Sequence, residues 1–397
     1  MIERLYVKMQ VELGAGSPNV GKLLRYFGNV SAVFAAPHST IRAIVRSPKA
    51  EKLLNGDFRR ADEIIKLCRE NDIKIICYEQ KEYPERLRNI SDPPALLYCR
   101  GELPEIDDHI AIAVVGPRKP DDYGIKAAFS LSARLARGGA IVVSGGAMGV
   151  DTEAHGGALW AGGQTIAVLG CGILFPYLKS NEQLRRRISG QGAVVSEYPP
   201  DAGALSSHFP MRNRIMAGLS LGTVVVQAAA RSGALITARH ALEQGRDVFV
   251  VPGRSGEKLF EGSNLLLKDG AKPVLNVMDI LEEYAERYPH RLLLDRIYSK
   301  DEPPIMKGFL EFHSAEIHAE ANKAPEAKKT LKIARTDLEC SEEAKKVYEA
   351  IVSGADCLDV LAQITGFDTP EVIVSLTELE IGGYIMAAPG GRYKIND

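Results

Sequence analysis

The sequence lacks several features that mark particular classes of protein. Its 397 residues include one Trp and only 7% aromatic residues, and 49 Lys+Arg against 51 Asp+Glu give a formal net charge of −2. No apolar run approaches the roughly 18 residues that a membrane span needs, and the first ten residues lack the apolar core of a signal peptide. We therefore expect a cytoplasmic protein with no membrane partner.

Cysteine patterns that would indicate a disulfide framework or a metal site are also missing. The six cysteines include no Cys-x-x-Cys pair and lie far apart, at Cys68, Cys77, Cys99, Cys171, Cys340 and Cys357. We expect reduced, mostly buried thiols and no metal site. The chain also has no HExxH string and no complete GxGxxG, and no nucleophile stands beside an obvious base. The sequence predicts no catalytic residue and no cofactor, and hence no enzyme.

The small net charge hides a difference between two regions. Residues 110–275 hold 18 Lys+Arg against 12 Asp+Glu, whereas residues 340–397 hold 4 against 10. A surplus of this size is modest, so a nucleic-acid site would have to come from local clustering of basic residues.

The N-terminal 71 residues alternate short helical patterns with turns. In the string GAGSPNVGKLLRYFG, residues 14–28, a glycine-rich turn enters a helix that Gly28 should end. These short helical patterns, separated by turns, predict a small helical module of the helix-hairpin-helix or SAM-like type over residues 1–71.

Residues 72–283 are expected to form an α/β domain. Short runs rich in Val and Ile alternate with helical stretches, and such runs are typical of strands buried on both faces of a parallel sheet. The predicted strands lie at residues 73–78, 94–101, 110–116, 140–146, 165–170, 193–199, 223–229 and 247–253. We therefore predict an extended Rossmann-like, mostly parallel sheet, which binds ligands at the carboxyl ends of its strands.

The pattern changes again toward the C-terminus. Residues 284–339 carry little apolar periodicity and are expected to form a linker. In residues 340–397, Ser341 should cap a helix, two further helices follow, and the segment 381–395 reads as a hairpin bent at Pro-Gly-Gly. Three helices and a hairpin predict a winged-helix domain.

Two glycine-containing turns in the α/β region are candidate phosphate sites. The strand at residues 110–116 runs into Gly116 and Arg118, where a phosphate could approach the backbone and pair with a guanidinium. The string SGGAMG precedes a helix whose first turn would expose N–H donors, and its candidate binding residues are Ser144, Gly145, Gly146 and Gly149.

Two later segments complete the candidate site. The string RNR places Arg212, Asn213 and Arg214 just before a helix that contains Gly218, and a second helix opens at Ser232 and Gly233 with Thr237 and Arg239 one and two turns on. Arginine suits these turns because its planar fork matches phosphate oxygens two at a time. Several such turns along one edge of a sheet fit consecutive phosphates of a strand better than one nucleotide.

Two polar residues near these turns are expected to be structural. Asp151, in the first turn of the predicted helix, could cap that helix and hold the glycine loop in shape. His155 lies on a helix rich in Ala and Gly, which favours a hydrogen-bonded packing residue over a ligand.

In their order along the chain, the strings SGGAMGVDTEAH, FPMRNRIMAGLS, SGALITARHALEQGRDVFVVPG and GSNLLLKDGA resemble the bacterial DNA-processing protein A family, DprA or Smf. The resemblance is dense over residues 72–271. It implies a non-catalytic protein that binds single-stranded DNA through a basic pocket, forms a homodimer and helps to load the RecA recombinase on incoming DNA during natural transformation. It also places the family's binding turns on the candidate residues named above.

The chain departs from the family pattern at two positions. Pro117 replaces the usual Ser or Thr, which removes a hydroxyl and an N–H, and Met148 stands where the family often has a basic residue. Both changes predict weaker DNA binding. The third helix of the winged domain, residues 368–380, has no Lys or Arg, so groove reading is not expected there, and the domain should contact protein or fold back on the basic edge.

Two other functions remain open on the sequence alone. The first is a nucleotide-binding or nucleotide-processing protein on a related Rossmann-like scaffold, such as a phosphoribohydrolase. The string GLSLGTVVVQ is the nearest match to that signature, but Gln227 stands where its carboxylate should be. The second is a scaffold that binds only proteins. Release of a base from nucleotide monophosphates would identify the first, and a scaffold would neither release a base nor bind DNA.

Overall fold

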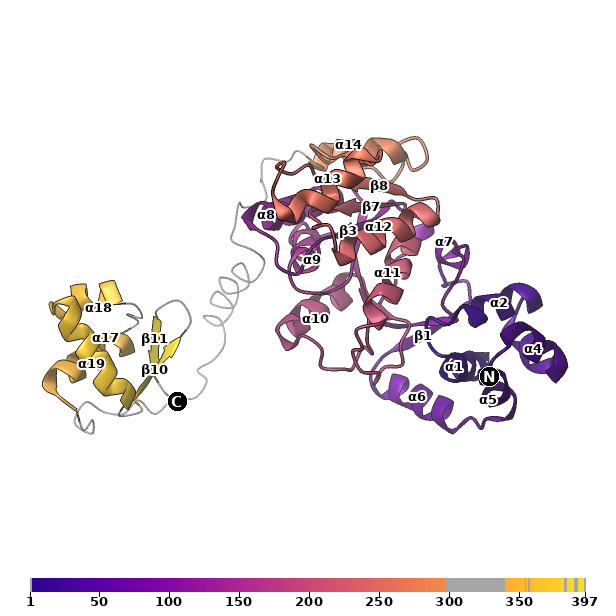
Figure 1. The fold of residues 1–397 in the computed structure, drawn as a ribbon, viewed down its shortest axis with the longest axis horizontal. Coiled ribbons are helices and arrows are strands. Elements are labelled where there is room, and N and C mark those ends of the chain that lie inside the picture. Colours follow the sequence, from indigo (N-terminus) through magenta and orange to yellow (C-terminus); the bar gives the residue numbers. More distant parts are fainter. Residues whose placement is uncertain are drawn as a thin grey trace. The chain divides into compact units, whose positions relative to one another are not determined.

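The computed structural model describes residues 2–297, 340–353, 355, 358–381, 384–388 and 392–395. The chain divides into two compact units, Met1–His318 and Ala319–Asp397, and Figure 1 shows the fold of each. Most of the predicted linker, residues 284–339, lies outside the described residues.

Six helices form the N-terminal module. They are α1 (Ile2–Leu13), α2 (Pro18–Phe27), α3 (Val30–Ala35), α4 (His38–Val45), α5 (Lys49–Asn55) and α6 (Arg59–Glu70). Gly28 ends α2 as predicted, and its N–H donates to the Leu24 carbonyl. Buried side chains of the module, such as Tyr6 and Ile64, share one core with Tyr98 and Val194 of the sheet. The module therefore packs directly on the α/β domain.

The α/β domain contains a nine-stranded sheet, and each of the eight predicted strands is present. The strands are β1 (Lys74–Cys77), β2 (Leu96–Gly101), β3 (Ala111–Val115), β4 (Ile141–Ser144), β5 (Thr165–Leu169), β6 (Ala193–Ser196), β7 (Gly222–Val225), β8 (Asp247–Val250) and β9 (Lys272–Pro273). The sequence did not predict β9, because two residues with a proline carry no strand pattern.

The order of the strands is β1-β2-β6-β5-β4-β3-β7-β8-β9. Strands β3 to β9 pair in parallel, whereas β1 pairs with β2, and β2 with β6, in antiparallel register. From β3 the chain proceeds through β4, β5 and β6 on one side, then returns to place β7 on the other side. This reversal opens a crevice at the carboxyl ends of β3, β4 and β7, where such folds bind ligands.

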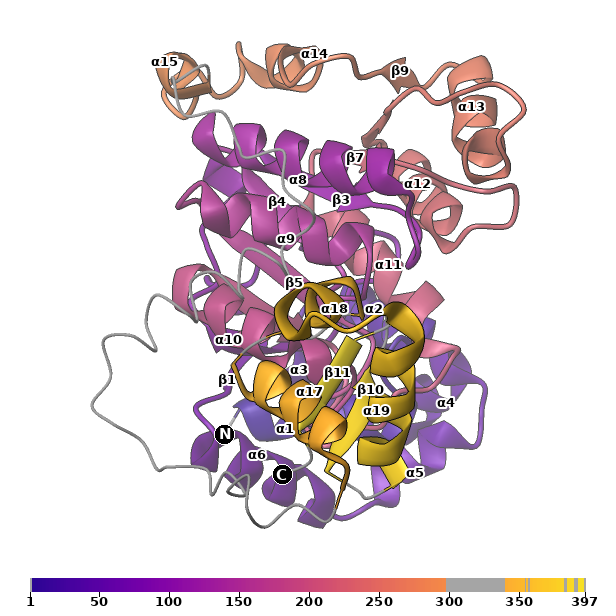
Figure 2. The ribbon, with the colours of Figure 1, turned by 90° about the vertical axis from the view of Figure 1, so that its left-hand side faces the viewer.

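Helices cover both faces of the sheet, as Figure 2 shows for the face that carries α8 and α9. On that face, α8 (Asp122–Arg137) and α9 (Val150–Trp160) bury Ile112 and Val114, and α10 (Glu182–Gln191) and the helical module cover the sheet further along. On the other face, α7 (Glu85–Arg88), α11 (His208–Leu219) and α12 (Gly233–Glu243) bury Ala111 and Val115. Successive side chains of β3 thus point to opposite faces of the sheet and are buried in both cores, as the Val- and Ile-rich pattern predicts.

Residues after β8 complete the first unit. They form α13 (Glu261–Lys268), β9, α14 (Met278–Leu281) and α15 (Leu294–Ile297). Leu281 and Ile297 are buried against the core beneath α8.

The second unit has the predicted winged-helix fold. It comprises α17 (Glu342–Val352), α18 (Leu358–Thr365), α19 (Thr369–Ile381) and a hairpin of β10 (Ile385–Ala388) and β11 (Arg392–Ile395). The Ser341 hydroxyl accepts from the Ala344 N–H and caps α17, while Val347, Leu361 and Leu376 fill the core. The predicted Pro-Gly-Gly bend lies outside the described residues.

Candidate functional site

A cavity of about 380 Å³ opens at the carboxyl ends of β3, β4 and β7. The β3–α8 loop, the start of α9, helix α11 and the first turns of α12 together form its walls. Its lining residues are Val115, Gly116, Pro117, Arg118, Ala147, Met148, Asp151, Phe209, Arg212, Asn213, Met216, Ala229, Ser232, Gly233, Ala234 and Thr237. The cavity therefore brings together eight of the residues selected from the sequence: Gly116, Arg118, Asp151, Arg212, Asn213, Ser232, Gly233 and Thr237.

Arg118 supplies an exposed cation at the edge of the cavity. Its guanidinium carbon lies 5.2 Å from the centre of the Phe209 ring on α11, within the range of a cation–π contact. Gly116 lets this loop pack closely, because a Cβ there would lie 2.5 Å from a methyl group of Val150. The aromatic ring thus positions Arg118 while its charge stays in contact with solvent.

Arg212 supplies a second, buried cation. Only 4% of its surface is exposed, and its Nη1 donates to the Val168 carbonyl at 2.6 Å. A side chain at Gly145 would overlap this guanidinium, so Gly145 admits Arg212 and does not line the cavity. Burial lowers the pKa of Arg212, and the nearby Asp151 carboxylate opposes that effect.

The glycine-rich loop differs from the prediction that its N–H groups face phosphate. The Ala147 N–H donates to Asp151 at 3.3 Å, and the Val150 N–H donates to the Pro117 carbonyl at 3.2 Å. The Ser144 hydroxyl donates to the Val114 carbonyl at 2.7 Å.

Correspondingly, Ser144, Gly145, Gly146 and Gly149 are not among the lining residues. Gly146 and Gly149 have φ of 65° and 81°, a backbone region that favours glycine. The loop therefore shapes the cavity by its conformation, and the donors named here are already used within the protein.

Asp151 and His155 both make internal contacts. Asp151 accepts from the Ala147 N–H and so holds the loop. Burial raises the pKa of Asp151, although Arg212 acts in the opposite direction. The His155 Nδ1 lies 2.8 Å from the Thr165 hydroxyl, which itself donates to the Val142 carbonyl, so the Nδ1 carries the proton. Burial lowers the pKa of His155 to about 3. The imidazole is therefore neutral at physiological pH.

Helix α12 points its N-terminus at the cavity. The Ser232 hydroxyl accepts from the Ala234 N–H at 3.2 Å and caps the helix, and the Asn213 amide donates to the Gly233 carbonyl at 3.4 Å. The partial positive charge of a helix N-terminus favours an anion here. Arg239 lies exposed further along α12 and is not a lining residue.

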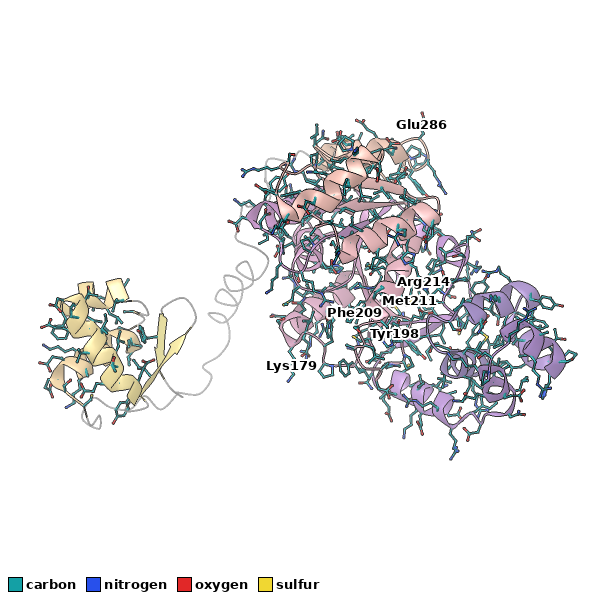
Figure 3. All side chains as sticks on the ribbon, in the orientation of Figure 1. Lys179, Tyr198, Phe209, Met211, Arg214 and Glu286 are labelled. Carbon is teal, nitrogen blue, oxygen red and sulfur yellow. The ribbon has the colours of Figure 1, made fainter. Side chains whose placement is uncertain are left out.

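The structure corrects the prediction for Arg214. Its guanidinium is 2% exposed and forms ion pairs with Glu197 at 2.8 Å and with Asp92 at 3.1 Å. Residues two apart on a helix point to different sides, so Arg212 reaches the cavity while Arg214 reaches Glu197 and Asp92. Figure 3 shows Arg214 further along α11 than Phe209. Arg214 is a structural residue that is not available to a phosphate.

Sequence reasoning did not select two aromatic residues at this edge. The rings of Phe209 and Tyr177 have their centres 5.3 Å apart, and Arg118 contacts the first of them. Phe209 precedes Arg212 by one helical turn, so its place on the same face could have been read from the spacing. Tyr177 comes from the loop after β5, and only the tertiary fold brings it close.

The sequence also contains a GxSxG string at residues 218–222, a pattern that occurs around serine nucleophiles. Here Ser220 is fully buried, its hydroxyl donates to the Met216 carbonyl at 2.9 Å, and it precedes β7. A nucleophile of that type follows its strand and is exposed, so Ser220 has no such geometry.

Within the described residues, no group of three or more His, Cys, Asp and Glu side chains could hold a metal ion. Among the same residues, no helix combines the length and the apolarity that crossing a membrane requires.

Comparison with known proteins identifies the family. The family described as DNA recombination-mediator protein A matches residues 74–285, and the DprA winged helix domain matches residues 323–391. This chain belongs to the DprA family. It is 39% identical to the DNA processing protein DprA of Bacillus subtilis over 230 residues, which cover 58% of this chain and 77% of that protein.

Further DprA-family members show the same relationship. Protein Smf of Escherichia coli is 35% identical over 324 residues, covering 81% of this chain and 77% of that protein. The crystal structure of DNA processing protein A from Streptococcus pneumoniae superposes with a TM-score of 0.63 at 34% identity, covering 71% of this chain and 98% of that one. These matches confirm the expected family and fold class, and the chain is a DNA-processing protein.

Proposed function

We propose that this protein binds single-stranded DNA along the edge formed by Arg118, Phe209 and Tyr177, with the cavity beside it. The observation that carries the proposal is the contact between the exposed Arg118 guanidinium and the Phe209 ring at the mouth of the cavity. Proteins that hold single strands combine cations for the phosphates with aromatic rings for the bases.

The charges around the cavity favour an anion. Arg118 is exposed and lines the cavity, the next residue along the chain, Lys119, is also exposed, Arg212 lies in the wall, and α12 directs its N-terminus toward the cavity. Asp151 is the one carboxylate among the described lining residues, and it accepts a hydrogen bond from the Ala147 N–H of the glycine-rich loop. An incoming phosphate therefore meets cationic groups and polarised N–H groups.

The extent of this edge favours a strand over a single nucleotide. A cavity of about 380 Å³ is near the lower end of the range for small-molecule sites, which is roughly 300–1,000 Å³. The Phe209–Tyr177 ring pair continues beyond the lining residues, because Tyr177 is not one of them. A second base could stack there while the first nucleotide occupies the cavity.

Fluorescence anisotropy with labelled oligo-dT of 5, 10, 20 and 40 nucleotides, at two salt concentrations, tests the proposal. We expect affinity to rise with length and to fall with salt. Equal binding of mononucleotide and 40-mer, or no dependence on salt, would contradict it. Double-stranded DNA of the same length serves as the matched control and should bind less tightly.

The wider role follows from the family. We propose a cytoplasmic, non-enzymatic recombination mediator that loads RecA on incoming single strands during natural transformation. The name of the matched family supports mediation. RecA-catalysed strand exchange on DNA coated with single-strand-binding protein should speed up when this protein is added, and an unchanged rate would contradict the loading role.

We also propose that the protein forms a homodimer. Leu265 on α13 and Leu275 after β9 are 53% and 81% exposed, and both belong to the segment around the edge strand β9. Exposed leucines beside a sheet edge are typical of a surface that another chain covers. Sedimentation should give a dimer mass, and Leu265→Glu should shift it toward the monomer.

A nucleotide-processing function has less support in the geometry. Gln227, which stands at the position of the carboxylate in that signature, is fully buried and donates to Asp121 at 2.7 Å. It is not a lining residue of the cavity. Release of a base from nucleotide monophosphates would favour this alternative.

The winged-helix unit is proposed to contact protein or to compete with DNA for the cationic edge. Helix α19 has an acidic residue in its first turn and no basic residue in its last turn. Residues 1–339, without this unit, should bind oligo-dT more tightly at low salt if the unit competes. Unchanged affinity would leave protein contact as its role.

A further inference from the structure

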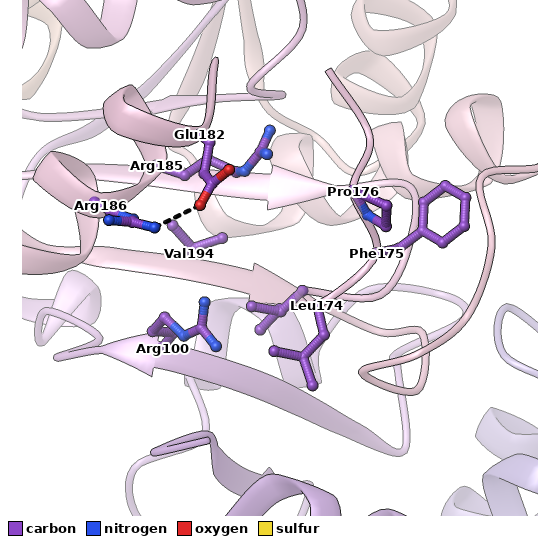
Figure 4. Close-up of a pocket in the computed structure, with 9 residues that line it drawn as sticks. Arg100, Leu174, Phe175, Pro176, Glu182, Arg185, Arg186 and Val194 are labelled. Atoms are coloured by element: carbon purple, nitrogen blue, oxygen red, sulfur yellow. Dashed lines mark hydrogen bonds and ion pairs between the residues drawn. The ribbon is translucent and has the colours of Figure 1, made fainter. Parts of the chain in front are cut away.

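A second cavity, of about 350 Å³, lies on the face of the sheet covered by α10 and the helical module. Figure 4 shows its lining: Arg100, Ile173, Leu174, Phe175, Pro176, Glu182, Arg185, Arg186 and Val194. Arg100 stands on β2 directly opposite Val194 on β6, and the three arginines come from β2 and α10. None of these residues lines the first cavity, so the two sites are separate.

The arginines are only partly neutralised within the protein. Arg186 pairs with Glu182 at 2.6 Å, and that carboxylate is the only one in the lining as the structure describes it. Arg100 and Arg185 each make one long hydrogen bond of 3.4 Å to a neutral carbonyl, those of Asn71 and Leu178. Among the described residues, neither forms an ion pair with a carboxylate.

This arrangement has an electrostatic cost that an anion would remove. Burial lowers the pKa of Arg100 and of Arg185. Asp72 opposes this effect at Arg100, whereas at Arg185 Cys171 and Glu182 oppose it and the proximity of Arg100 adds a smaller lowering. Like charges that are partly withdrawn from water repel each other more strongly than charges on an open surface. A dianion between the two guanidinium groups would relieve this repulsion and accept their unused donors.

The other end of the cavity is apolar. Leu174, Phe175 and Pro176, consecutive in the chain, line one side, and Ile173 and Val194 are the other apolar residues of the lining. In Figure 4 the guanidinium groups lie on the side of α10 and β2, and the Phe175 ring lies at the far side. Such a division suits a ligand with a charged group at one end and a flat or apolar body at the other.

We propose that this cavity binds a phosphomonoester, with the phosphate between Arg100 and Arg185 and the attached body against Leu174 and Pro176. A free mononucleotide and the 5′-terminal phosphate of a DNA strand share this chemistry. Because Arg100 also contacts Asn71 at the end of α6, a bound phosphate would tie the helical module to α10. The proposal does not depend on DNA binding at the first cavity.

Calorimetry of the full-length protein with dTMP tests the site. We expect binding, and a rise in Tm with dTMP concentration because the ligand binds only the folded chain. Arg185→Gln should weaken dTMP binding at least about tenfold, since it removes one charged partner of the phosphate, and Arg185→Lys should weaken it less. Lys66→Ala, on the exposed face of α6 and outside both cavities, serves as the control and should leave dTMP binding unchanged.

Arg100 is partly buried on a strand, so Arg100→Gln is informative only if its circular dichroism spectrum and Tm match those of the parent. If they do not match, the Arg185 variants on helix α10 carry the test. Absence of dTMP binding together with equal affinity for phosphorylated and unphosphorylated oligo-dT would overturn the proposal. Binding that Arg185→Gln leaves unchanged would overturn it too. If inorganic phosphate binds the protein as tightly as dTMP does, the proposed role of the apolar wall is overturned.

Two further titrations distinguish the source of the phosphate. A gain in affinity for 5′-phosphorylated over unphosphorylated oligo-dT, lost in Arg185→Gln, would identify a strand end. Binding of dTMP without such a gain would identify a free nucleotide. Unphosphorylated oligo-dT should bind Arg185→Gln as tightly as the parent, which separates failure at this site from failure at the first cavity.

Discussion

The Nη2 atom of Arg214 lies 2.8 Å from both carboxylate oxygens of Glu197, and the two side chains are 2% and 4% exposed. Asp92 contacts the same guanidinium at 3.1 Å and is itself 28% exposed. This buried pair joins α11 to the segment after β6, so one of the two arginines of the Arg-Asn-Arg motif stabilises the fold.

We therefore predict that Arg214→Met lowers the free energy of unfolding by about 3–5 kcal/mol, because it leaves Glu197 buried without its partner. Urea denaturation measures the loss. Asp92→Asn should cost less, since Asp92 is partly solvated. An Arg214→Met protein of unchanged stability that no longer binds DNA would show that Arg214 contacts the strand after all.

Gly145 should be intolerant of a side chain. A Cβ there would overlap the Arg212 guanidinium, so Gly145→Ala should displace Arg212 from the Val168 carbonyl. We expect a loss of about 1–3 kcal/mol in stability from overpacking, with weaker binding of oligo-dT. Gly190→Ala on α10 is the matched control, because no atom lies within 4 Å of the added Cβ and Gly190 does not line the cavity. Equal behaviour of the two variants would contradict this prediction.

Phe209 should contribute stacking and no charge. Phe209→Ala is expected to weaken oligo-dT binding by about 1–3 kcal/mol, the usual cost of losing one base–aromatic contact. The slope of log K against log salt should stay close to the parental value, because no phosphate contact is lost directly. Phe209→Tyr keeps the ring and should bind almost normally. A Phe209→Ala protein with parental affinity would exclude stacking on this ring.

The fold was largely predictable because its signals are local. Eight strands, the Gly28 helix end and the Ser341 cap each follow from a pattern of a few residues. The site was less predictable, because its geometry depends on which way each side chain points. Arg212 and Arg214 look equivalent in sequence, yet the helix turns one toward the cavity and the other toward Glu197.

Contacts between distant segments explain the remaining differences. The glycine loop bonds to Asp151 and to the Pro117 carbonyl, and neither contact has a signature in the sequence. Tyr177 reaches Phe209 from a loop that precedes it by 32 positions, a separation at which periodicity carries no information. Such pairs become visible only when the chain is folded.

His155 should make stability depend on pH. Its pKa is about 3 in the folded protein and about 6.5 in an unfolded chain, so the unfolded state binds more protons between these values. Stability is therefore retained above pH 6.5 and lost as the pH falls. We expect a loss of about 2 kcal/mol between pH 7 and pH 5 from this group.

His155→Gln has no such titration, so the difference between its pH profile and that of the parent isolates the effect. Denaturant titrations at pH 5, 6 and 7 provide the two profiles. Parallel profiles would show that His155 takes up its proton over the same pH range in the folded and the unfolded protein.

The account depends most directly on Arg118 as a phosphate ligand. The decisive measurement is the affinity for oligo-dT as a function of salt, compared between the parent, Arg118→Ala and Lys66→Ala, a control on the exposed face of α6. Arg118→Ala removes one phosphate contact, so it should weaken binding whatever the base sequence of the oligonucleotide and reduce the slope of log K against log salt by about 0.7. Lys66→Ala should leave both the affinity and the slope unchanged. An Arg118→Ala protein with the parental slope and affinity would contradict the proposed interface.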